Sequence, residues 1–458
     1  MNFNATPAEN FEYIASAVER AGGRAYFVGG CVRDGLLGKS PKDTDIEIYG
    51  LEAGAIERIL RRRFRVEIVG KSFGVWILKG CDIDVSMPRR ERKSGIGHKA
   101  FEIEGDPNMT PREACARRDF TINAILRDIL TGEIVDPFGG VEDLRRGLLR
   151  HTSERFAEDP LRVLRAMQFA ARFDFDVAPE TVGLCSQIPF ENLPCERVFE
   201  EWKKMLLKGV KISRGLEFLK NCGWVKYFPE LSACVGCPQD REWHPEGDVY
   251  THTAFCLDTF ALERTGDDRE DLIVGLAVLC HDFGKPLCTK RDPDGHIRSR
   301  GHDILGVRPT ENFLNRLTRE KSLIAEVVPL VERHMAILDL WRNQCGDGAI
   351  RRLARKVGRI DRLVRVDSAD RGGRPPIVPE PSPQGLWILE RARELQVQDS
   401  APKPLLMGRH LIEMGLSPSA KFADILDAVY EAQLDGEFAD LDGARAFAEK
   451  FLEDGGFM

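Results

Sequence analysis

The sequence predicts an α+β protein, in which an N-terminal α/β head with a mixed or antiparallel sheet precedes an all-α remainder. Short segments rich in β-branched residues and bounded by glycine alternate with helical segments up to about residue 135. From about Phe156 onward, the apolar residues follow a helical period almost to the end of the chain. Because compact domains usually hold about 100–200 residues, the 458 residues indicate several domains.

Five segments of the head are expected to be strands, and a long helical region follows them. The strands are Arg24–Val28, Asp45–Tyr49, Arg65–Val69, Gly74–Lys79 and Ile83–Ser86. A proline-rich stretch at 375–383 is typical of a linker or an ordered loop. We therefore expect a head at 1–150, a helical neck at 151–235, a helical middle domain at 236–374 and a helical tail at 384–458.

The composition favours soluble domains in a reducing compartment. No stretch approaches the roughly 20 apolar residues of a membrane helix, and the N-terminal sequence lacks the pattern of a signal peptide. The twelve cysteines show no repeating framework, so reduced thiols and a cytoplasmic location are expected. The net charge of −7 does not by itself favour a nucleic-acid partner. Basic residues nevertheless cluster at 58–65, 89–93 and 351–365, which permits a large acidic substrate.

A Gly-Gly turn joins the first expected strand to a short helix. Gly29 and Gly30 would let backbone N–H groups approach phosphate oxygens, and Arg33 would add positive charge nearby. Many such turns are only turns, so this one indicates a phosphate site only in combination with the carboxylates that follow it.

Asp43 and Asp45 lie two residues apart where the next strand begins. The two-residue period of a strand places both carboxylates on one face, and Asp84 can add a third from a neighbouring strand. Oxygen ligands on one side suit Mg²⁺ bound to a nucleoside triphosphate. A two-metal site of this kind activates an attacking 3′-hydroxyl and neutralises the leaving pyrophosphate. The sequence therefore predicts Asp43 and Asp45 as Mg²⁺ ligands and Asp84 as a third catalytic carboxylate.

These motifs resemble those of the class II tRNA nucleotidyltransferases, or CCA-adding enzymes, and of the related bacterial poly(A) polymerases. The resemblance begins with residues 29–45 and continues in order through RRDFTINA at 117–124, DPFGG at 136–140 and EDPLR at 158–162. It implies template-independent addition of CCA to the 3′ ends of tRNA from CTP and ATP, with release of pyrophosphate. The partners implied are tRNA, CTP and ATP.

The start of the expected long helix offers residues for choosing the base. Asp159 is a good helix cap, yet it also shares a helical face with Arg162. Acceptors on Asp159 and donors on Arg162 can match the edges of cytosine and adenine, which is the role that the resemblance implies. The resemblance also implies that Arg118 and Arg165 contact the nucleotide. This chain has Gln168 where many relatives have an arginine, so that phosphate contact is not carried over.

A basic stretch at 89–97 lies between the carboxylates and the RRDFTINA motif. Its residues alone indicate either a mobile loop that contacts phosphate or a solvated turn. In the family, this region is a flexible loop that takes part in the switch from C to A addition.

Histidines and aspartates recur through the middle domain at intervals of about 20–35 residues. Such a set suits Mn, Fe, Co, Ni or Zn. Their order resembles the HD phosphohydrolase superfamily, which implies phosphatase and 2′,3′-cyclic phosphodiesterase chemistry. The resemblance assigns four ligands and the two further ligands of two-metal members: His252, His281, Asp282 and Asp367, with His302 and His334.

Three other interpretations stay open from the sequence. The nearest is a poly(A) polymerase or an enzyme that adds only CC or only A, although the acidic end at 435–458 differs from the basic extension usual in poly(A) polymerases. The second is an HD hydrolase with a degenerate head, and the third is a non-catalytic RNA-binding module. The tail at 384–458 is expected to bind tRNA by analogy alone. The oligomeric state does not follow from the sequence.

Overall fold

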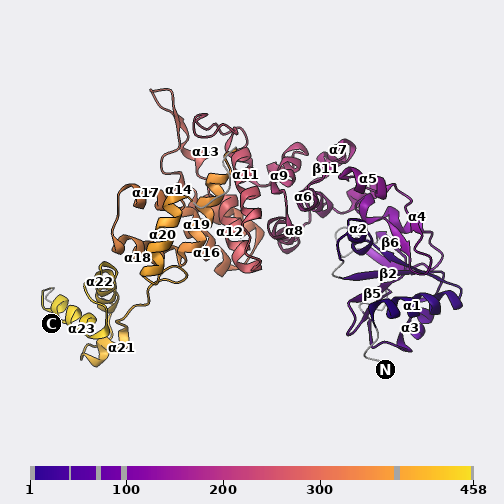
Figure 1. The fold of residues 1–458 in the computed structure, drawn as a ribbon, viewed down its shortest axis with the longest axis horizontal. Coiled ribbons are helices and arrows are strands. Elements are labelled where there is room, and N and C mark those ends of the chain that lie inside the picture. The colour runs from indigo at the N-terminus through magenta and orange to yellow at the C-terminus, as the bar shows by residue number, and fades with distance from the viewer. Residues whose placement is uncertain (1–5, 41–42, 69–73, 94–100, 376–381, 455–458) are drawn as a thin grey trace. The chain divides into compact units, whose positions relative to one another are not determined.

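The computed structural model describes the whole chain except residues 1–5, 41–42, 69–73, 94–100, 376–381 and 455–458. At 91–93 and 101–104, on either side of one of these gaps, the structure describes the backbone and not the side chains. The chain forms two compact units (Figure 1). The first holds Met1–Glu201 with Arg214–Trp224, and the second holds Trp202–Ser213 with Val225–Met458.

The first unit is built on a seven-stranded mixed sheet in the order β3-β4-β5-β2-β1-β8-β9. β2 and β5 pair in parallel, and the remaining neighbours pair antiparallel. The strands are β1 Arg24–Val28, β2 Thr44–Tyr49, β3 Val66–Ile68, β4 Val75–Leu78, β5 Ile83–Ser86, β8 Leu126–Asp128 and β9 Ile134–Val135. The mixed sheet and the five predicted strands are thereby confirmed, each within about two residues at either end.

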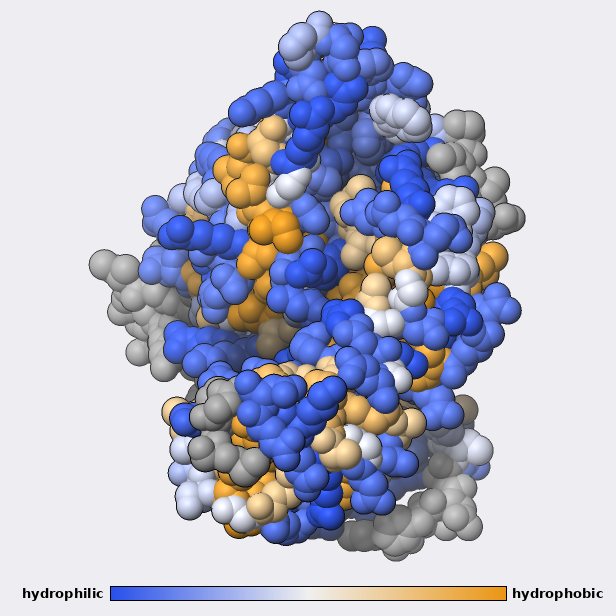
Figure 2. Space-filling view, turned by 90° about the vertical axis from the view of Figure 1, so that its left-hand side faces the viewer, coloured by the Kyte–Doolittle hydropathy of each residue, from blue (hydrophilic) through white to orange (hydrophobic). Residues whose placement is uncertain are grey.

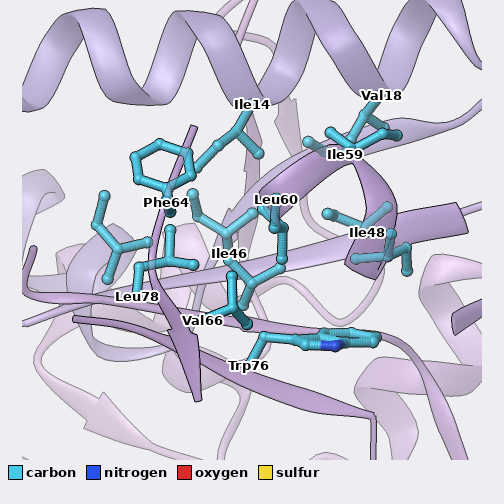
Figure 3. Close-up of a cluster of buried hydrophobic side chains, with 14 of the residues drawn as sticks. Ile14, Val18, Ile46, Ile48, Ile59, Leu60, Phe64, Val66, Trp76 and Leu78 are labelled. Carbon is cyan, nitrogen blue, oxygen red and sulfur yellow. The ribbon is translucent and has the colours of Figure 1, made fainter. Parts of the chain in front are cut away.

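Two helices cover one face of this sheet, α1 Pro7–Arg20 and α3 Ala53–Arg61. A capping box between Thr6 and Glu9 starts α1 by satisfying backbone N–H groups that a helix leaves without partners. Ile14 of α1 points toward Ile46 of β2 in a fully buried cluster (Figure 3). This packing fixes β2, the strand that carries the predicted metal ligands.

The remaining helices of the first unit follow the sheet and begin the long helical region. They are α2 Gly30–Leu36, α4 Pro111–Ala116, α5 Gly140–Arg146, α6 Leu161–Phe173 and α7 Pro179–Gln187. Two helices, α8 Cys195–Lys208 and α9 Ile212–Asn221, contain points at which the chain passes between the units. A short parallel pair joins β10 Leu148–Leu149 to β11 Asp176–Val177.

The basic stretch at 89–97 is not a loop over its described part. β6 Arg89–Lys93 pairs antiparallel with β7 Phe101–Gly105 and forms a two-stranded ribbon. The expectation of a loop or turn is wrong for 89–93, because backbone pairing with 101–105 supplies the partners that composition alone could not reveal. The rest of that stretch, 94–97, lies outside the described residues.

The second unit is helical apart from a small hairpin, β12 Lys290–Arg291 with β13 Ile297–Arg298. Its helices are α10 Pro229–Cys234, α11 Val249–Leu262, α12 Asp268–Cys280, α13 Lys285–Cys288, α14 His302–Leu305, α15 Val307–Leu317, α16 Lys321–Glu332, α17 Ala336–Arg342, α18 Asp347–Val357, α19 Ile360–Gly372, α20 Pro383–Glu394, α21 Gly408–Glu413, α22 Lys421–Asp435 and α23 Leu441–Asp454. The expected all-α remainder is confirmed, and the four-domain division stays a prediction.

The two long helices α11 and α12 carry apolar residues on most sides. They pack against each other and against α19, and α12 also packs against α16. None of the helices in the described ranges is long and apolar enough to cross a membrane. The face in Figure 2 is largely hydrophilic, with hydrophobic residues gathered in patches between hydrophilic ones. The four histidines predicted as metal ligands lie on, or next to, α11, α12, α14 and α16.

Candidate active sites

Three carboxylates lie close together on β2 and β5, two neighbouring inner strands of the sheet in the first unit, and on the residue before β2. In the parallel pairing of β2 with β5, Asp45 lies directly opposite Asp84, and Asp43 precedes Asp45 by two residues. All three residues are exposed. Although Asp45 is exposed as a residue, neighbouring atoms desolvate its carboxyl group, and this desolvation together with the charges of Asp84 and Asp43 raises its pKa. Carboxylates that repel one another in this way gain most from a shared divalent cation, so this carboxylate trio fits Mg²⁺.

Gly29 brings the main chain against the carboxylate trio. Its φ of +69° is a conformation that residues with a side chain rarely adopt. A Cβ there would lie 3.3 Å from Nη1 of Arg118 and 3.9 Å from Oδ2 of Asp45. The predicted turn therefore lies between the trio and an arginine, where the close approach of the backbone requires glycine.

A pocket of about 480 Å³ opens beside this turn, and we call it the head pocket. It brings together all seven residues predicted to bind the nucleotide: Gly29, Gly30, Arg33, Arg118, Asp159, Arg162 and Arg165. The other residues of its lining are Asp119, Asn123, Leu161, Phe169 and Arg197. Five arginines against two aspartates make the lining suited to a polyanion.

Arg33 lies at the back of the head pocket and is almost fully buried. Its Nη1 donates to Oδ1 of Asn123 at 2.6 Å, and its Nε donates to Oδ1 of Asp34 at 2.8 Å. Its guanidinium also lies 4.7 Å from the ring centre of Phe173. These contacts hold Arg33 in one place, so it supplies fixed positive charge to the pocket.

A buried carboxylate that the sequence analysis missed holds the arginines of the RRDFTINA motif. Glu47 is 1% exposed and lies on β2, where its carboxylate accepts from Arg117 at 3.4 Å and from Arg118 at 3.3 Å. Tyr49 donates its hydroxyl to the same carboxylate at 2.6 Å. The arrangement directs Arg118 to the head pocket without leaving a buried charge unpaired.

Replacing Glu47 by alanine is expected to lower the free energy of unfolding by about 3 kcal/mol, since it removes the buried carboxylate that Arg117 and Arg118 share. Urea denaturation followed by circular dichroism measures the change. Glu67→Ala is a matched control, because Glu67 is an exposed glutamate of the same sheet that pairs with the exposed Lys79. A loss at Glu47 no larger than at Glu67 would contradict the anchoring role.

Arg165 is held by a second buried carboxylate, Asp119. Its Nε and Nη2 both donate to Oδ2 of Asp119, at 2.8 and 2.5 Å. Burial alone would raise the pKa of Asp119, but Arg165 and the amide of Asn123 hold it below the usual value. The pair is therefore ionised at neutral pH and fixes Arg165 in the lining of the head pocket.

Asp159 and Arg162 lie at the start of α6, as the sequence predicts. Oδ1 of Asp159 accepts from the backbone N–H of Leu161 at 3.1 Å, and Oδ2 accepts from Arg197 at 3.0 Å. The guanidinium of Arg162 donates to the backbone carbonyls of Arg155 and Arg117 at 2.7 and 2.6 Å. Both side chains are thus fixed at the pocket wall, which a site that reads a base edge requires.

Gln168 is 2% exposed and is not part of the head pocket lining. Among the described residues, its Nε2 finds no hydrogen-bond partner. The residue that departs from the family pattern therefore lies in the core of α6 and does not contact the pocket.

Two groups of metal-ligating side chains lie close together in the second unit. The first histidine cluster consists of His252, Cys256, His281 and Asp370, and the second consists of Asp282, His302 and His334. Within each cluster, one candidate ligand atom per residue lies within 4.8 Å of all the others. Since His281 and Asp282 are adjacent in sequence, the two clusters adjoin.

The predicted ligand Asp367 does not join either cluster. Its Oδ2 accepts from the hydroxyl of Ser382 at 2.7 Å, whereas Oδ1 of Asp370 lies 2.9 Å from Nε2 of His252. Asp367 and Asp370 are three residues apart on α19, so both are near the centre, but only Asp370 turns its carboxylate to the histidines. The prediction of Asp367 is wrong in position for this reason.

The backbone fixes the tautomers of three histidines. Nδ1 of His281, His302 and His334 lies 2.7–2.8 Å from the carbonyl oxygens of Val278, Ser299 and Val331. A carbonyl oxygen only accepts, so each Nδ1 carries a hydrogen and each Nε2 is the ring nitrogen that faces the centre. In His252, Nδ1 donates to Glu246 at 2.7 Å with the same result.

In two contacts at the centre, two atoms that can each act as a metal ligand lie within about 3 Å of each other. Nε2 of His302 lies 3.0 Å from Nε2 of His334, and Nε2 of His252 lies 2.9 Å from the Asp370 carboxylate. Burial and the neighbouring histidines lower the pKa of His334 to about 4, so a bridging proton is disfavoured there. Two nitrogens that each lie about 2.1 Å from one ion are about 3.0 Å apart at a right angle. The ligand set thus fits transition metals.

Comparison with known proteins places these sites in a family. Residues 25–150 match the family described as "Poly A polymerase head domain". The Multifunctional CCA protein of Nitrosococcus oceani is 36% identical over 370 residues, which cover 78% of this chain and 87% of that protein. The protein of the same name from Neisseria gonorrhoeae is 40% identical over 316 residues, covering 68% and 73%. The chain belongs to the class II CCA-adding enzyme family.

Solved CCA-adding enzymes share the fold. The Bacillus stearothermophilus CCA-adding enzyme in complex with CTP matches with a TM-score of 0.68 at 23% identity, over 99% of both chains. The Thermotoga maritima CCA-adding enzyme complexed with tRNA matches with a TM-score of 0.60 at 20% identity, over 98% of this chain and 96% of that one. The fold therefore holds across the length of the chain even where sequence identity is low.

This CCA-adding family member also has two pockets beside its histidine clusters, of about 390 and 190 Å³. Trp243 lines both and is 61% exposed, and Asp370 and Arg374 also line both. Trp243, Arg374 and Asp370 were not among the residues predicted from the sequence. The aromatic residue before the His244-Pro245 step is a signal that could have directed attention to the first of these.

Proposed function

We propose that the first unit adds CCA to the 3′ ends of tRNA from CTP and ATP and releases pyrophosphate. The observation that carries this proposal is the carboxylate trio at the edge of a pocket lined by Asp159 and Arg162. A polymerase without a template needs both a metal-binding carboxylate site and a fixed protein surface that chooses the base. Relatives named as CCA proteins at 35–40% identity support the same activity.

In this proposal, Asp43, Asp45 and Asp84 hold Mg²⁺, which supplies charge neutralisation at the phosphates and lowers the pKa of the attacking 3′-hydroxyl. Arg33, Arg118 and Arg165 bind the triphosphate, while Gly29 and Gly30 permit close approach of the backbone. The 3′-hydroxyl of tRNA attacks the α-phosphate and the bond to pyrophosphate breaks. The protein contributes mainly by positioning and charge compensation.

The direct test supplies tRNA that lacks CCA with CTP and ATP, separately and together, and resolves the products at single-nucleotide resolution. Three added residues, formed only when both nucleotides are present, are expected. Addition of CC alone, of A alone or of a long A tail would support one of the alternative enzymes of the same family. If no nucleotide is added in the presence of Mg²⁺, the proposal fails.

Asp159→Ala and Arg162→Ala are each expected to reduce discrimination of CTP and ATP against UTP and GTP. A matched pair of hydrogen bonds to a base edge contributes about 1–3 kcal/mol, so the ratio of kcat/KM values should fall about 5- to 150-fold. Arg155→Ala is the control, since Arg155 is exposed and holds Arg162 only through its backbone carbonyl. Unchanged selectivity in both variants would contradict their role in base choice.

We also propose that the second unit hydrolyses phosphoesters at an HD-type centre, with phosphatase and 2′,3′-cyclic phosphodiesterase activity. Support comes from two adjoining clusters whose histidines direct their Nε2 atoms to the centre, next to pockets that contain the cationic side chains Lys285, Arg371 and Arg374. A metal ion there supplies an activated water at neutral pH. Hydrolysis of 2′,3′-cyclic AMP that is lost with a chelator and restored by Ni²⁺, Co²⁺, Mn²⁺, Fe²⁺ or Zn²⁺ is the expected result.

The remaining parts of the proposal concern tRNA. The helical tail at 384–458 binds the body of tRNA, and the protein acts in the cytoplasm, where tRNA is processed. The twelve cysteines are all free, which is consistent with a reducing compartment.

A further inference from the structure

A thiol that the HD ligand pattern does not include lies inside the first histidine cluster. Cys256 follows His252 by four residues on α11, so the two side chains share one face of the helix. Its Sγ lies 3.3 Å from Nε2 of His252, the nitrogen that points to the centre. The residue is fully buried.

Apart from Nε2 of His252, the described surroundings of Cys256 offer the sulfur little hydrogen bonding. Its other described polar contact is with the backbone carbonyl of Asp370 at 3.7 Å, which is weak for a thiol. Gly373 faces the sulfur, and a Cβ at that position would overlap with it. The fold thus keeps a space beside the histidines that sulfur fills.

We propose that Cys256 is a metal ligand and that the first histidine cluster is a mixed site of two nitrogens, one sulfur and one oxygen. The inference deepens the proposed HD function, because it concerns the metal of that same centre. With bonds of about 2.0–2.1 Å to nitrogen and 2.3 Å to sulfur, a shared ion places the two atoms about 3.1–3.6 Å apart. The 3.3 Å between Cys256 and His252 lies in this interval.

A sulfur ligand makes the two clusters chemically unequal. When the metal–sulfur bond forms, the thiol proton leaves to solvent and the thiolate binds the ion. Thiolate favours Zn²⁺, Co²⁺ and Ni²⁺ over Mn²⁺ and Mg²⁺. The second cluster, with Asp282, His302 and His334, has no sulfur among its described candidate ligands and is less selective. The first cluster therefore selects the thiophilic ion, and the second accepts a wider range of cations.

Absorption spectroscopy of the full-length protein loaded with Co²⁺ tests the proposal. A thiolate-to-cobalt charge-transfer band in the near ultraviolet is expected for the wild type and is expected to be lost in Cys256→Ser. Residues that only hydrogen-bond to metal ligands contribute about 10–100-fold to metal affinity. A direct ligand contributes at least as much, so the affinity for Co²⁺ should fall at least tenfold in this variant. Cys280→Ser is the matched control, since Cys280 is equally buried and precedes His281 but belongs to neither cluster.

X-ray absorption of the zinc-loaded wild-type protein keeps the test independent of whether the variant folds. One sulfur at about 2.3 Å from zinc supports the proposal, and a shell of nitrogen and oxygen alone overturns it. If zinc binds without sulfur and hydrolysis of 2′,3′-cyclic AMP persists, the role of Cys256 fails while the HD function stands. If no ion binds in the second unit, both fail. Cys31 lies near Asp45 in the first unit and is a second possible source of a thiolate-to-cobalt band. The band is therefore assigned to Cys256 by its loss in Cys256→Ser and not by its presence in the wild type.

Discussion

Asp45→Ala is expected to reduce nucleotide incorporation at least about 10³-fold while leaving the free energy of unfolding unchanged or slightly higher. The carboxylate lies opposite Asp84 and two residues from Asp43, and desolvation together with the charges of these two neighbours raises the pKa of Asp45. Replacing Asp45 by alanine removes a proposed metal ligand and also relieves this repulsion and desolvation. Single-turnover extension of tRNA and urea denaturation, both on the same preparation, measure the two effects.

Magnesium provides a control that does not depend on activity. A ligand that binds only the folded state raises its melting temperature, so Mg²⁺ should stabilise the wild type and not Asp45→Ala. Glu67→Ala, which removes an exposed carboxylate elsewhere on the sheet, should keep both incorporation and the response to Mg²⁺. Substantial incorporation by Asp45→Ala would disprove the assignment of the metal site.

Asp370→Asn is expected to lower metal-dependent hydrolysis of 2′,3′-cyclic AMP at least about 100-fold, whereas Asp367→Asn should change it less than about threefold. Only Asp370 directs its carboxylate to the histidines, at 2.9 Å from His252. Asp367 accepts a hydrogen bond from Ser382, which an asparagine oxygen can also accept. The two variants carry the same substitution about one helical turn apart, so comparing them tests which of the two aspartates is the metal ligand.

Equilibrium dialysis should show weaker Zn²⁺ binding for Asp370→Asn and unchanged Zn²⁺ binding for Asp367→Asn. Nucleotide incorporation should be retained in both variants, because the carboxylate trio and the head pocket belong to the first unit. The reverse order of effects, with Asp367→Asn inactive and Asp370→Asn active, would show that the centre is assembled differently from the structure described.

The parts of the fold that follow local rules could be predicted from the sequence. The strand β2 and its two outward carboxylates follow from the two-residue period, and the start of α6 follows from the sequence Asp159-Pro160. All seven residues predicted to bind the nucleotide line one pocket.

The parts that depend on rotation or on distant pairing could not be predicted. Asp367 and Asp370 both lie on α19, and only the packed orientation of that helix decides which carboxylate reaches His252. The ribbon of β6 and β7 depends on pairing across a gap in sequence, and Arg197 meets Asp159 from 38 residues away. No local pattern of residues encodes these contacts.

The main-chain carbonyls that orient His281, His302 and His334 have a consequence for how this protein can diverge. A side-chain substitution at 278, 299 or 331 leaves the carbonyl in place, so it does not remove the hydrogen bond that sets the imidazole. His252 depends instead on one side chain, Glu246, and is the sensitive member of the set. The orientation of these three imidazoles thus depends on the path of the backbone, so the side chains at 278, 299 and 331 can change in evolution without altering the proposed ligand geometry.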